Sequence, residues 1–457
     1  MSSRWLRSPV HACITVCMAV CVVACIPAAE LTAQTTATAP SAATDSAPPP
    51  PGASAALDSA RALAGERLTA ALLTYGPSDV VFERFGHVAL AIRDNATGQE
   101  IAYNWGMFDF DQPKFLQRFL TGDTRYWMVG YSADAFNAAY VADNRSIRRQ
   151  TLALTPVERA ALYEYLLWFS RDENKFYRYD YYRDNCSTRV RDALDRVLGG
   201  RLRPSLDVPG AGRTWRGETA RVTATDIPVY AGIQIALGRN ADRPMSKWEE
   251  AFLPEHMASA FATLVLPNAA GQRYRLVTND SMQFVANRVP MPADPPGRTT
   301  MAALLGLTLA GLIAVLADLR GRAPRVLLAL LVGVWYLVGG VLGTLLLLAG
   351  TVTKHAPYMG QNLTLLELNP LLLVAAIAVP VALARHRRSR GAMGVSAVIA
   401  LMSLIGLVLR AVPSFAQQHG VVLAVIVPVH VALAIAVWRL GHASPHASAA
   451  TSVSGAR

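Results

Sequence analysis

Cysteine is scarce in this chain and unevenly distributed. Four of the five cysteines, at positions 13, 17, 21 and 25, lie in the first 25 residues, so Cys186 is the single cysteine of the remaining chain. One cysteine cannot form an intrachain disulfide within that part, which excludes a disulfide-stabilised scaffold there. Charge is scarce as well: charged residues make up 16% of the chain and hydrophobic residues 52%. This balance favours a membrane protein over a soluble one.

Several motifs of common chemistry are missing. The nine histidines are scattered, with no HExxH or CxxC pattern, and no glycine-rich phosphate loop is present. We therefore expect neither a metal nor a nucleotide cofactor. The net charge of +11 is not gathered into a basic stripe on a nucleic-acid-binding module, and much of it is arginine at the ends of apolar segments. Nucleic acid is therefore not an expected partner.

The N-terminus has the pattern of an export signal. Arg4 and Arg7 precede an apolar run over about residues 12–24, which is typical of a signal segment and is expected to end near residue 33. Three endings stay open: "VVAC" at 22–25 as a lipobox that makes Cys25 a lipid anchor, cleavage near "IPAAE", or a retained anchor helix. Residues 34–60 are rich in Pro, Ala, Ser and Thr and predict a disordered linker.

The chain changes character near residue 301. Five apolar segments follow, at 301–317, 326–352, 368–384, 391–409 and 420–438. Each has about the length needed to cross a bilayer core of roughly 30 Å. Residues 301–440 are therefore expected to form a transmembrane domain, followed by a tail at 441–457.

The loops between these segments alternate in charge. Two of them carry seven arginines between them, namely Arg320, Arg322, Arg325, Arg385, Arg387, Arg388 and Arg390. The loops at 353–367 and 410–419 hold only Lys354 and Arg410. The positive-inside rule places the arginine-rich loops and the tail in the cytoplasm, and residues 26–300 and the loop 353–367 outside. We expect a multi-pass protein of the bacterial inner membrane with a periplasmic domain.

Residues 61–300 have mixed composition and predict an α+β domain. "VVFERFGHVALAIRD" is expected to be a strand, because Val88, Leu90 and Ile92 alternate with His87, Ala89 and Ala91. "NATGQ" at 95–99 predicts a turn and "EIAYNWG" the returning strand. Downstream, Asp184 or Asn185 is expected to cap a helix that ends at the glycines 199–200. Cys186 then lies in the first turn of that helix.

This position favours a reactive cysteine. A helix N-terminus stabilises a thiolate through its unpaired N–H groups and the helix dipole, so we expect the pKa of Cys186 to be lowered. Arg183, Arg189 and Arg191 are close in sequence and add to this effect if they point inward. The simpler interpretation is that a lone buried cysteine is a small, inert packing residue.

A nucleophilic cysteine needs a histidine base held by a third polar group. His87 is the best candidate, because it lies on the strand that leads into the hairpin. Asn104 on the returning strand is placed to fix the tautomer of the imidazole. The simpler interpretation of a lone histidine beside a glycine is again packing.

Three motifs resemble a known family. "FGHVALAI", "YNWGMFDF" and "DNCSTRVRD" resemble the bacterial Lnb-type N-terminal periplasmic domain, which is similar to the circularly permuted papain-like and NlpC-like enzymes. The resemblance covers about residues 70–290, and "TKHAPYMGQNLTLLELNPL" at 353–371 resembles the outward loop of the family. It implies a permuted papain-like (NlpC-like) fold with Cys186 as nucleophile and His87 as base. Asn104 fits the third role by position only.

The resemblance also implies a reaction. It is the transfer of a fatty acyl chain from a phospholipid, through a cysteine thioester, to the N-terminal amine of a lipoprotein. The expected partners are thus a phospholipid donor, a lipoprotein acceptor and the bilayer. His355 and Asn362, in the loop expected on the same side as the periplasmic domain, are candidates for binding a lipid headgroup, or are ordinary polar loop residues. His430 is a further candidate because it lies within an apolar segment, but the sequence gives it no partner.

Two other functions stay open: a papain-like hydrolase that acts on cell-wall peptides or amide bonds, and a non-enzymatic membrane scaffold. No wall-binding repeat is appended, and five membrane segments are more than an anchor requires. The boundary near residue 300 further predicts that the periplasmic domain folds after removal of residues 301–457.

Overall fold

The computed structural model describes residues 47–268 and 270–442, which divide into two compact units. The described residues within 32–230 and 243–295 form one of them, which we call the sheet unit. Residues 231–242 and those from 296 onward form the other, the helical unit. The expected domain 61–300 is therefore interrupted, because twelve residues in its middle and its last few residues belong to the helical unit.

The sheet unit is built on seven antiparallel strands in the order β11-β5-β1-β2-β3-β4-β6. Their bounds are β1 Leu68–Tyr75, β2 His87–Asp94, β3 Glu100–Met107, β4 Arg125–Ser132, β5 Ile147–Leu152, β6 Phe176–Arg178 and β11 Val277–Phe284. Strands β1 to β4 follow one another in the chain and are neighbours in the sheet, and β1 lies between β2 and β5. The central strands are consequently buried while β6 and β11 form the edges.

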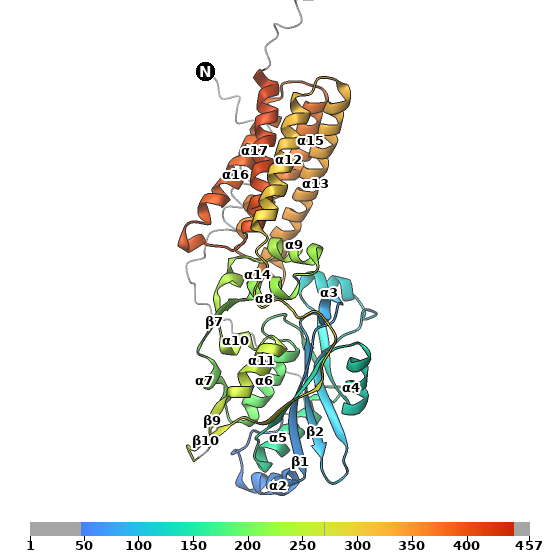
Figure 1. Ribbon diagram of the computed structural model, residues 1–457, viewed down its shortest axis with the longest axis vertical. Helices are drawn as coiled ribbons and strands as arrows, with labels where there is room; N and C mark the ends of the chain where they lie inside the picture. The colour runs from blue at the N-terminus through green and yellow to red at the C-terminus, as the bar shows by residue number, and fades with distance from the viewer. Residues whose placement is uncertain (1–46, 269, 443–457) are drawn as a thin grey trace, which may run out of the picture. The chain divides into compact units, whose positions relative to one another are not determined.

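Helices cover both faces of this sheet (Figure 1). On one face lie α5 (Pro156–Phe169), α6 (Cys186–Val197) and α11 (Pro254–Thr263), and on the other lies α4 (Ala133–Ala142). Each face of the sheet has its own hydrophobic core, and β2 contributes alternate residues to the two. Val88 and Leu90 pack toward α5 and α6, and Ala89 and Ala91 toward α4. The predicted alternation is confirmed, since successive strand residues point to opposite faces.

The hairpin that the sequence predicts is also confirmed. The turn after β2 closes with Asp94 N–H donating to Gln99 O at 2.9 Å. The strand itself is shorter than expected, because residues Val81–Glu83 form a 3-10 turn (η2) before it. The helix α5 begins with a capping box, in which the N–H of Thr155 donates to Glu158 Oε2 at 2.8 Å.

One boundary differs from the prediction. Helix α2 (Ala55–Glu66) begins inside the expected linker 34–60. Arg61 on this helix is 1% exposed and its Nη2 lies 2.6 Å from Glu164 Oε2 on α5. Gly65 lies so close to α5 that a side chain there would clash with the backbone of Pro156. These contacts order residues 55–60, which composition alone assigned to a linker. Residues 1–46, with the expected signal or anchor segment and Cys25, lie outside the described residues, as does the tail 443–457.

Shorter elements complete the sheet unit. They are α3 Phe115–Thr121, α7 Leu202–Leu206, β7 Pro209–Thr214, α8 Trp215–Val222, β8 Pro244–Ser246, α10 Lys247–Glu250, β9 Val265–Pro267 and β10 Arg273–Arg275. Strands β7 and β8 pair with each other, as do β9 and β10. Helix α11 begins at Pro254, so the chain breaks between α10 and α11.

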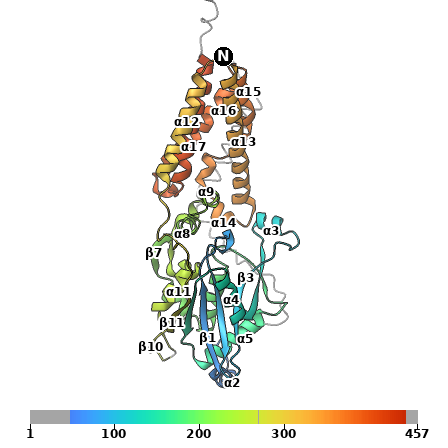
Figure 2. The same ribbon diagram turned by 45° about the vertical axis from the view of Figure 1, so that its right-hand side comes forward.

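The helical unit contains five helices long and apolar enough to cross a membrane, among the residues described (Figure 2). They are α12 Thr299–Asp318, α13 Arg322–Val352, α15 Leu371–Ala384, whose apolar span begins at Leu363, α16 Arg390–Leu409 and α17 Gly420–His442. Helix α12 packs against α17, and α13 against α15. Many large apolar side chains on them stay exposed, such as Leu330 at 63% and Val408 at 65%. Exposed apolar surface on this scale marks a lipid-facing bundle.

Residues 231–242 join the helical unit through backbone contacts. This segment contains the second half of α9 (Ile227–Ala236) and the turn η3 (Arg239–Asp242). The N–H of Gly238 donates to Tyr358 O at 2.7 Å, and Asn362 Nδ2 donates to the carbonyls of Ile235 and Ala236 at 2.9 and 3.0 Å. Removing residues 301–457 deletes all these partners. Folding of the remaining chain stays a prediction, and residues 231–242 would lose these contacts in it.

Candidate active site

The first turn of α6 fixes the position of Cys186. Asn185 is the N-cap, and its Oδ1 accepts hydrogen bonds from the N–H groups of Ser187 and Thr188, both at 2.9 Å. Thr188 Oγ1 in turn accepts from the N–H of Asn185 at 2.8 Å. The cap is itself held to the unit, because Asn185 Nδ2 donates to Phe252 O at 3.0 Å. Of the two cap candidates in the sequence, Asn185 is the one used, and Cys186 is the first helical residue.

The sheet opens where this helix begins. Strand β1 pairs with β2 down to His87, but β3 pairs with β2 only between Leu90–Tyr103 and Arg93–Glu100. The first residues of β2 thus extend beyond the ladder to β3. The N–H of Val88 lies in this opening and interacts with the sulfur of Cys186. Cys186 therefore contacts β2 where this strand is not paired with β3.

Gly106, at the end of β3, lies between Cys186 and His87. Its φ of +97° is a conformation that L side chains rarely adopt. A Cβ placed there would lie 3.3 Å from Cys186 Cβ and 3.9 Å from His87 Cε1. Both side chains therefore lie within 4 Å of one point. The structure thus brings together the cysteine and the histidine that the sequence predicts as a pair. A side chain at position 106 would occupy the space between them, and glycine leaves that space open.

Asn104 is placed to orient the imidazole. It is fully buried, and its Oδ1 lies 3.4 Å from His87 Nε2. Its Nδ2 donates to the carbonyl of Val129 on β4 at 3.1 Å, which fixes which end of the amide faces the histidine. Because an amide oxygen can only accept, His87 carries its proton on Nε2 and keeps a lone pair on Nδ1. This is the form that a base requires.

Burial controls the charge of both groups. It raises the pKa of the Cys186 thiol to about 12, although the N–H groups of Ser187, Cys186 and Val88 act in the opposite direction. Burial also lowers the pKa of His87 to about 4, against the hydrogen bond to Asn104, which raises it. The expectation of a lowered pKa for Cys186 is wrong, because desolvation outweighs the helix N-terminus. At neutral pH the site holds a thiol beside a neutral imidazole.

Arg145 contributes a positive charge that acts on both Cys186 and His87, and sequence reasoning missed it. It follows α4, is 4% exposed, and donates through Nη1 to Glu83 Oε2 at 2.9 Å and through Nε to Gly76 O at 2.8 Å. Its Nη2 is buried without a hydrogen-bond partner among the described residues. Its positive charge lowers the pKa of both Cys186 and His87, so it favours the thiolate and the neutral imidazole. No sequence signal links a loop arginine to a cysteine so far along the chain.

The arginines near Cys186 in sequence do not take this role. Arg189 forms a two-point ion pair with Asp184. Arg191 bonds Asp192 and donates to Trp248 O at 2.6 Å. Arg183 is exposed and lies over the ring of Trp215. The three arginines that are close to Cys186 in the sequence therefore have other partners and do not point toward its thiol.

Aromatic rings enclose the histidine. The ring of His87 is nearly parallel to that of Tyr140, at 6.4 Å between centroids and 8° between planes, and Tyr75 and Phe136 lie at similar distances. Tyr179, which also borders Gly106, stacks on Tyr126 at 4.2 Å. These rings cover part of the imidazole, which is half-buried, and so limit the contact of His87 with water.

The two loop candidates belong to the helical unit rather than to the sheet unit. Asn362 is fully buried, and besides its bonds to residues 235 and 236 its Oδ1 accepts from the N–H of Thr364 at 3.0 Å and from Gln417 Nε2 at 2.8 Å. These bonds give Asn362 a structural role in the loop. His355 is 8% exposed. Headgroup binding by either residue stays a prediction.

His430 has the partner that the sequence could not supply. Its Nδ1 lies 2.7 Å from Ser403 Oγ on the neighbouring helix α16, and both side chains are fully buried. The ring of Trp335 meets it edge to face at 6.2 Å. The contact ties α16 to α17 within the helical unit.

One group of side chains has the composition of a metal site. Donor atoms of Glu218, Glu255 and His256 lie within 4.8 Å of one another. Arg221 enters the same group, with its Nη2 2.7 Å from Glu218 Oε2 and also paired with Glu255. A guanidinium thus supplies the positive charge that a metal would, so the group is an ion-pair cluster in which Glu218 and Arg221 are buried and Glu255 is exposed.

Comparison with known families agrees with this geometry. Residues 57–217 match the family described as the Lnb N-terminal periplasmic domain. This part of the chain is similar to that domain family, and we call it the Lnb domain. The Lnb domain so defined contains His87, Asn104, Arg145 and Cys186, and the five apolar helices lie C-terminal to it. Comparisons with curated proteins and with solved structures gave no match.

Proposed function

We propose that the protein is a cysteine-dependent membrane acyltransferase. It moves a fatty acyl chain from a phospholipid to the N-terminal amine of a lipoprotein. The observation that carries the proposal is the meeting of Cys186 and His87 around Gly106 inside an Lnb domain. The apolar helices, which bring the chain to the lipid, support it.

The first half-reaction forms a thioester. The sulfur of Cys186 attacks the ester carbonyl of the donor while the S–H proton passes to His87. The tetrahedral intermediate collapses by breaking the ester C–O bond, and the imidazolium returns the proton to the departing oxygen. A lysophospholipid leaves, and the acyl chain stays on sulfur. Arg145 stabilises the negative charge that develops on the sulfur.

The second half-reaction transfers the acyl chain to nitrogen. The uncharged amine of the acceptor attacks the thioester, and His87 accepts the proton that the nitrogen loses. Collapse of the intermediate breaks the C–S bond, forms the amide and restores the thiol. Asn104 keeps the imidazole in one tautomer through both halves.

The neutral resting pair suits transfer rather than hydrolysis. With the pKa of Cys186 raised to about 12, the nucleophile is generated only when His87 takes its proton at the moment of attack. The aromatic rings beside His87 reduce the access of water, which would compete with the amine for the thioester.

The proposal extends to the fold relationship and to placement in the cell. A histidine strand that precedes a cysteine helix supports a permuted papain-like domain. The arginine-rich loops support a bacterial inner-membrane protein with its Lnb domain in the periplasm. A reporter fused after Arg457 is then active in the cytoplasm and silent in the periplasm, and the opposite pattern would overturn this orientation.

The test of the reaction is to trap the thioester. Full-length protein in detergent is incubated with a phospholipid that carries a labelled acyl chain, without an amine acceptor. We expect the label on the peptide containing Cys186, released by hydroxylamine, and no label in Cys186→Ala. Adding a diacylated lipopeptide with a free N-terminus should move the label onto that peptide as an amide.

Three outcomes contradict the proposal. Labelling that persists in Cys186→Ala would exclude this nucleophile. Release of free fatty acid at the same rate with and without lipopeptide would indicate a hydrolase of lipids. Cleavage of wall peptides by the wild type, absent in Cys186→Ala, would favour the papain-like amidase.

A further inference from the structure

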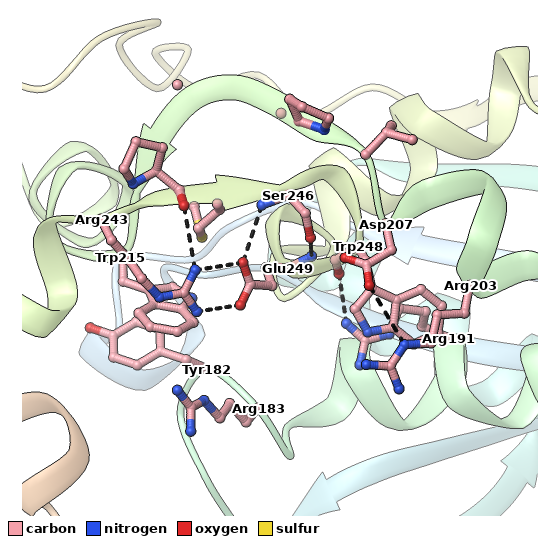
Figure 3. A pocket seen from close by; sticks show the side chains of 16 residues that line it. Tyr182, Arg183, Arg191, Arg203, Asp207, Trp215, Arg243, Ser246, Trp248 and Glu249 are labelled. Atoms are coloured by element: carbon pink, nitrogen blue, oxygen red, sulfur yellow. Dashed lines mark hydrogen bonds and ion pairs between the residues drawn. The ribbon is translucent and has the colours of Figure 1, made fainter. Parts of the chain in front are cut away.

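Two regions of the sheet unit have no role in the reaction above. One is the cavity of about 880 Å³ shown in Figure 3, which Cys186 and His87 do not line. Three of its four lining arginines form ion pairs with carboxylates, namely Arg191 with Asp192, Arg203 with Asp207 and Arg243 with Glu249. The charges of this cavity are therefore largely matched by the protein itself. The second region is apolar and exposed.

This second region, which we call the aromatic surface, is formed by the turn η2, the segment 108–114 and helix α3. Phe110 on it is 60% exposed and Leu116 is 67% exposed. The other exposed apolar side chains that form the surface are Val81, Phe82, Phe119 and Leu120. A single exposed apolar side chain is common on a protein, but a group of large ones in contact marks a site of interaction.

Contacts between rings make the aromatic surface contiguous. The ring centroid of Phe108 lies 5.2 Å from that of Phe82 and 5.1 Å from that of Phe110. Phe115 lies 6.2 Å from Phe108 and, at its other side, stacks on Phe119 at 6.2 Å. The contact between Phe82 and Phe108 joins the turn before β2 to the segment after β3. The surface is therefore one patch built from two separate segments of the chain.

Both segments leave the sheet at the end that carries the active site. Strand β2 begins at His87, and the antiparallel strand β3 ends at Met107, directly after Gly106. The turn η2 precedes β2, and the segment 108–114 follows β3. The aromatic surface therefore lies at the end of the sheet at which Cys186 and His87 meet.

A row of rings connects the aromatic surface to the thiol. The ring of Phe108 lies 5.0 Å from that of Tyr126, and Tyr126 stacks on Tyr179 at 4.2 Å. A Cβ placed on Gly106 would lie 3.9 Å from Tyr179 Cε2 and 3.3 Å from Cys186 Cβ. Aromatic side chains thus extend without interruption from the exposed surface to the reactive cysteine.

The charges on this surface balance. Residues 108–121 contain two acidic and two basic side chains, which are Asp109, Asp111, Lys114 and Arg118. The acidic residue of η2, Glu83, is paired with Arg145 at 2.9 Å. With no excess of either sign, the surface favours neither an acidic nor a basic partner, so its partner is apolar.

The chain supplies an apolar partner through its own membrane helices. Pro295 is the last residue of the sheet unit, and α12 begins four residues later at Thr299. This helix is long and apolar enough to cross a membrane. Four residues span at most about 14 Å. A bilayer that α12 crosses is therefore within reach of the sheet unit.

We propose that the aromatic surface inserts into the bilayer that the apolar helices cross. Phe and Leu side chains gain free energy in the boundary between lipid headgroups and acyl chains, because their apolar area is removed from water. A lipid layer requires no matching shape or charge, which suits a contiguous apolar patch of balanced charge. The row of rings would then guide a lipid ester to Cys186. That consequence rests on the proposed acyl transfer, whereas the insertion itself does not.

Photolabelling of the full-length protein tests the insertion. The protein is reconstituted into phosphatidylcholine vesicles in which some of the lipid carries a diazirine in its acyl chain, and labelled residues are located by mass spectrometry. We expect label within residues 108–121 as well as in the apolar helices. The yield should be the same at low and high salt, because the charges of the surface balance. Cys186→Ala, which cannot form a thioester, should be labelled in the same way.

The decisive variant places charge on the surface. Phe110→Asp/Leu116→Asp should lower the labelling of residues 108–121 by about tenfold, because a carboxylate is costly to bring into lipid. Phe110→Leu/Leu116→Phe keeps the apolar character and should be labelled as the wild type is. The matched control is Leu63→Asp/Leu167→Asp, at exposed apolar positions of α2 and α5. It should leave the labelling of residues 108–121 unchanged.

Four outcomes would overturn the insertion. They are the absence of label from residues 108–121 of the wild type, equal labelling of the wild type and the aspartate variant, loss of label at high salt, and cross-links between two copies of the chain in place of lipid label. The third would indicate electrostatic attachment, and the fourth would assign the surface to a second copy. Since Cys186→Ala is labelled without any thioester, the insertion is decided separately from the acyl transfer.

Discussion

The two units each bury a polar cluster, and the two clusters differ in how completely their hydrogen bonds are formed. In the helical unit Asn362 and Gln417 bond to each other, and Gln417 Oε1 also accepts from the N–H of Leu363 at 2.9 Å. In the sheet unit the contact between His87 and Asn104 is long, at 3.4 Å, and one nitrogen of Arg145 has no hydrogen-bond partner among the described residues. A complete network stabilises a fold, whereas an incomplete one leaves capacity for a substrate or a transition state.

The largest test of this difference is at the incomplete cluster. His87→Ala should lower the rate of acyl transfer by about 10²–10⁴-fold, because a positioned general base contributes that much. The thermal stability in detergent should change little. Transfer of labelled acyl chain to a lipopeptide measures the rate.

The control for that variant is His386→Ala, at an exposed position of the helical unit. It should keep the full rate. A His87→Ala protein that transfers at half the wild-type rate or faster would show that the ring only packs against its aromatic neighbours.

The next test uses pH. With the pKa of Cys186 raised to about 12 and that of His87 lowered to about 4, the free protein holds almost no thiolate at neutral pH. The thiolate fraction below the thiol pKa grows about tenfold per pH unit. Alkylation of Cys186 by iodoacetamide should therefore rise by about 100-fold between pH 7 and pH 9. A rate that stays level over this range would show a preformed thiolate–imidazolium pair instead.

The smallest expected effect is at the complete cluster. Asn362→Ala leaves the carbonyls of residues 235 and 236 without a donor, and the N–H of Thr364 and the amide of Gln417 without an acceptor. We therefore expect the free energy of unfolding to fall by about 2–4 kcal/mol. Unfolding in a mixed-detergent titration measures it. Asn240→Ala, which loses one hydrogen bond of 3.3 Å to Pro357 O at an exposed site, should cost less than about 1 kcal/mol. Equal losses in the two variants would remove the distinction between the clusters.

What the sequence predicted well is local. The capping residue of α6, the position of Cys186 and the hairpin of β2 and β3 depend on neighbours a few residues apart, and the apolar spans depend on length and composition. The cap of α6 needs only Asn185 and Thr188, which are three residues apart in the sequence. These features are confirmed because tertiary contacts did not compete with the local preference.

What the sequence could not predict depends on distant contacts. Arg145 reaches the site from a loop 41 residues before Cys186, and no spacing rule relates the two. The direction of the pKa shift at Cys186 was wrong, because the helix N-terminus is a local feature while burial results from the whole unit. The pairing of α2 with α5 through Arg61 and Glu164 overrode a composition typical of linkers in the same way.

The segment 231–242 also constrains the order in which the chain can fold. Its hydrogen-bond partners, among them Tyr358, Gln361 and Ser414, are synthesised more than a hundred residues after it. The Lnb domain at 57–217 is complete before any of them exists. Residues 231–242 must therefore wait, without their final contacts, until the loops that precede α15 and α17 have been made. The helical unit is consequently complete only after the loop before α17 has been made.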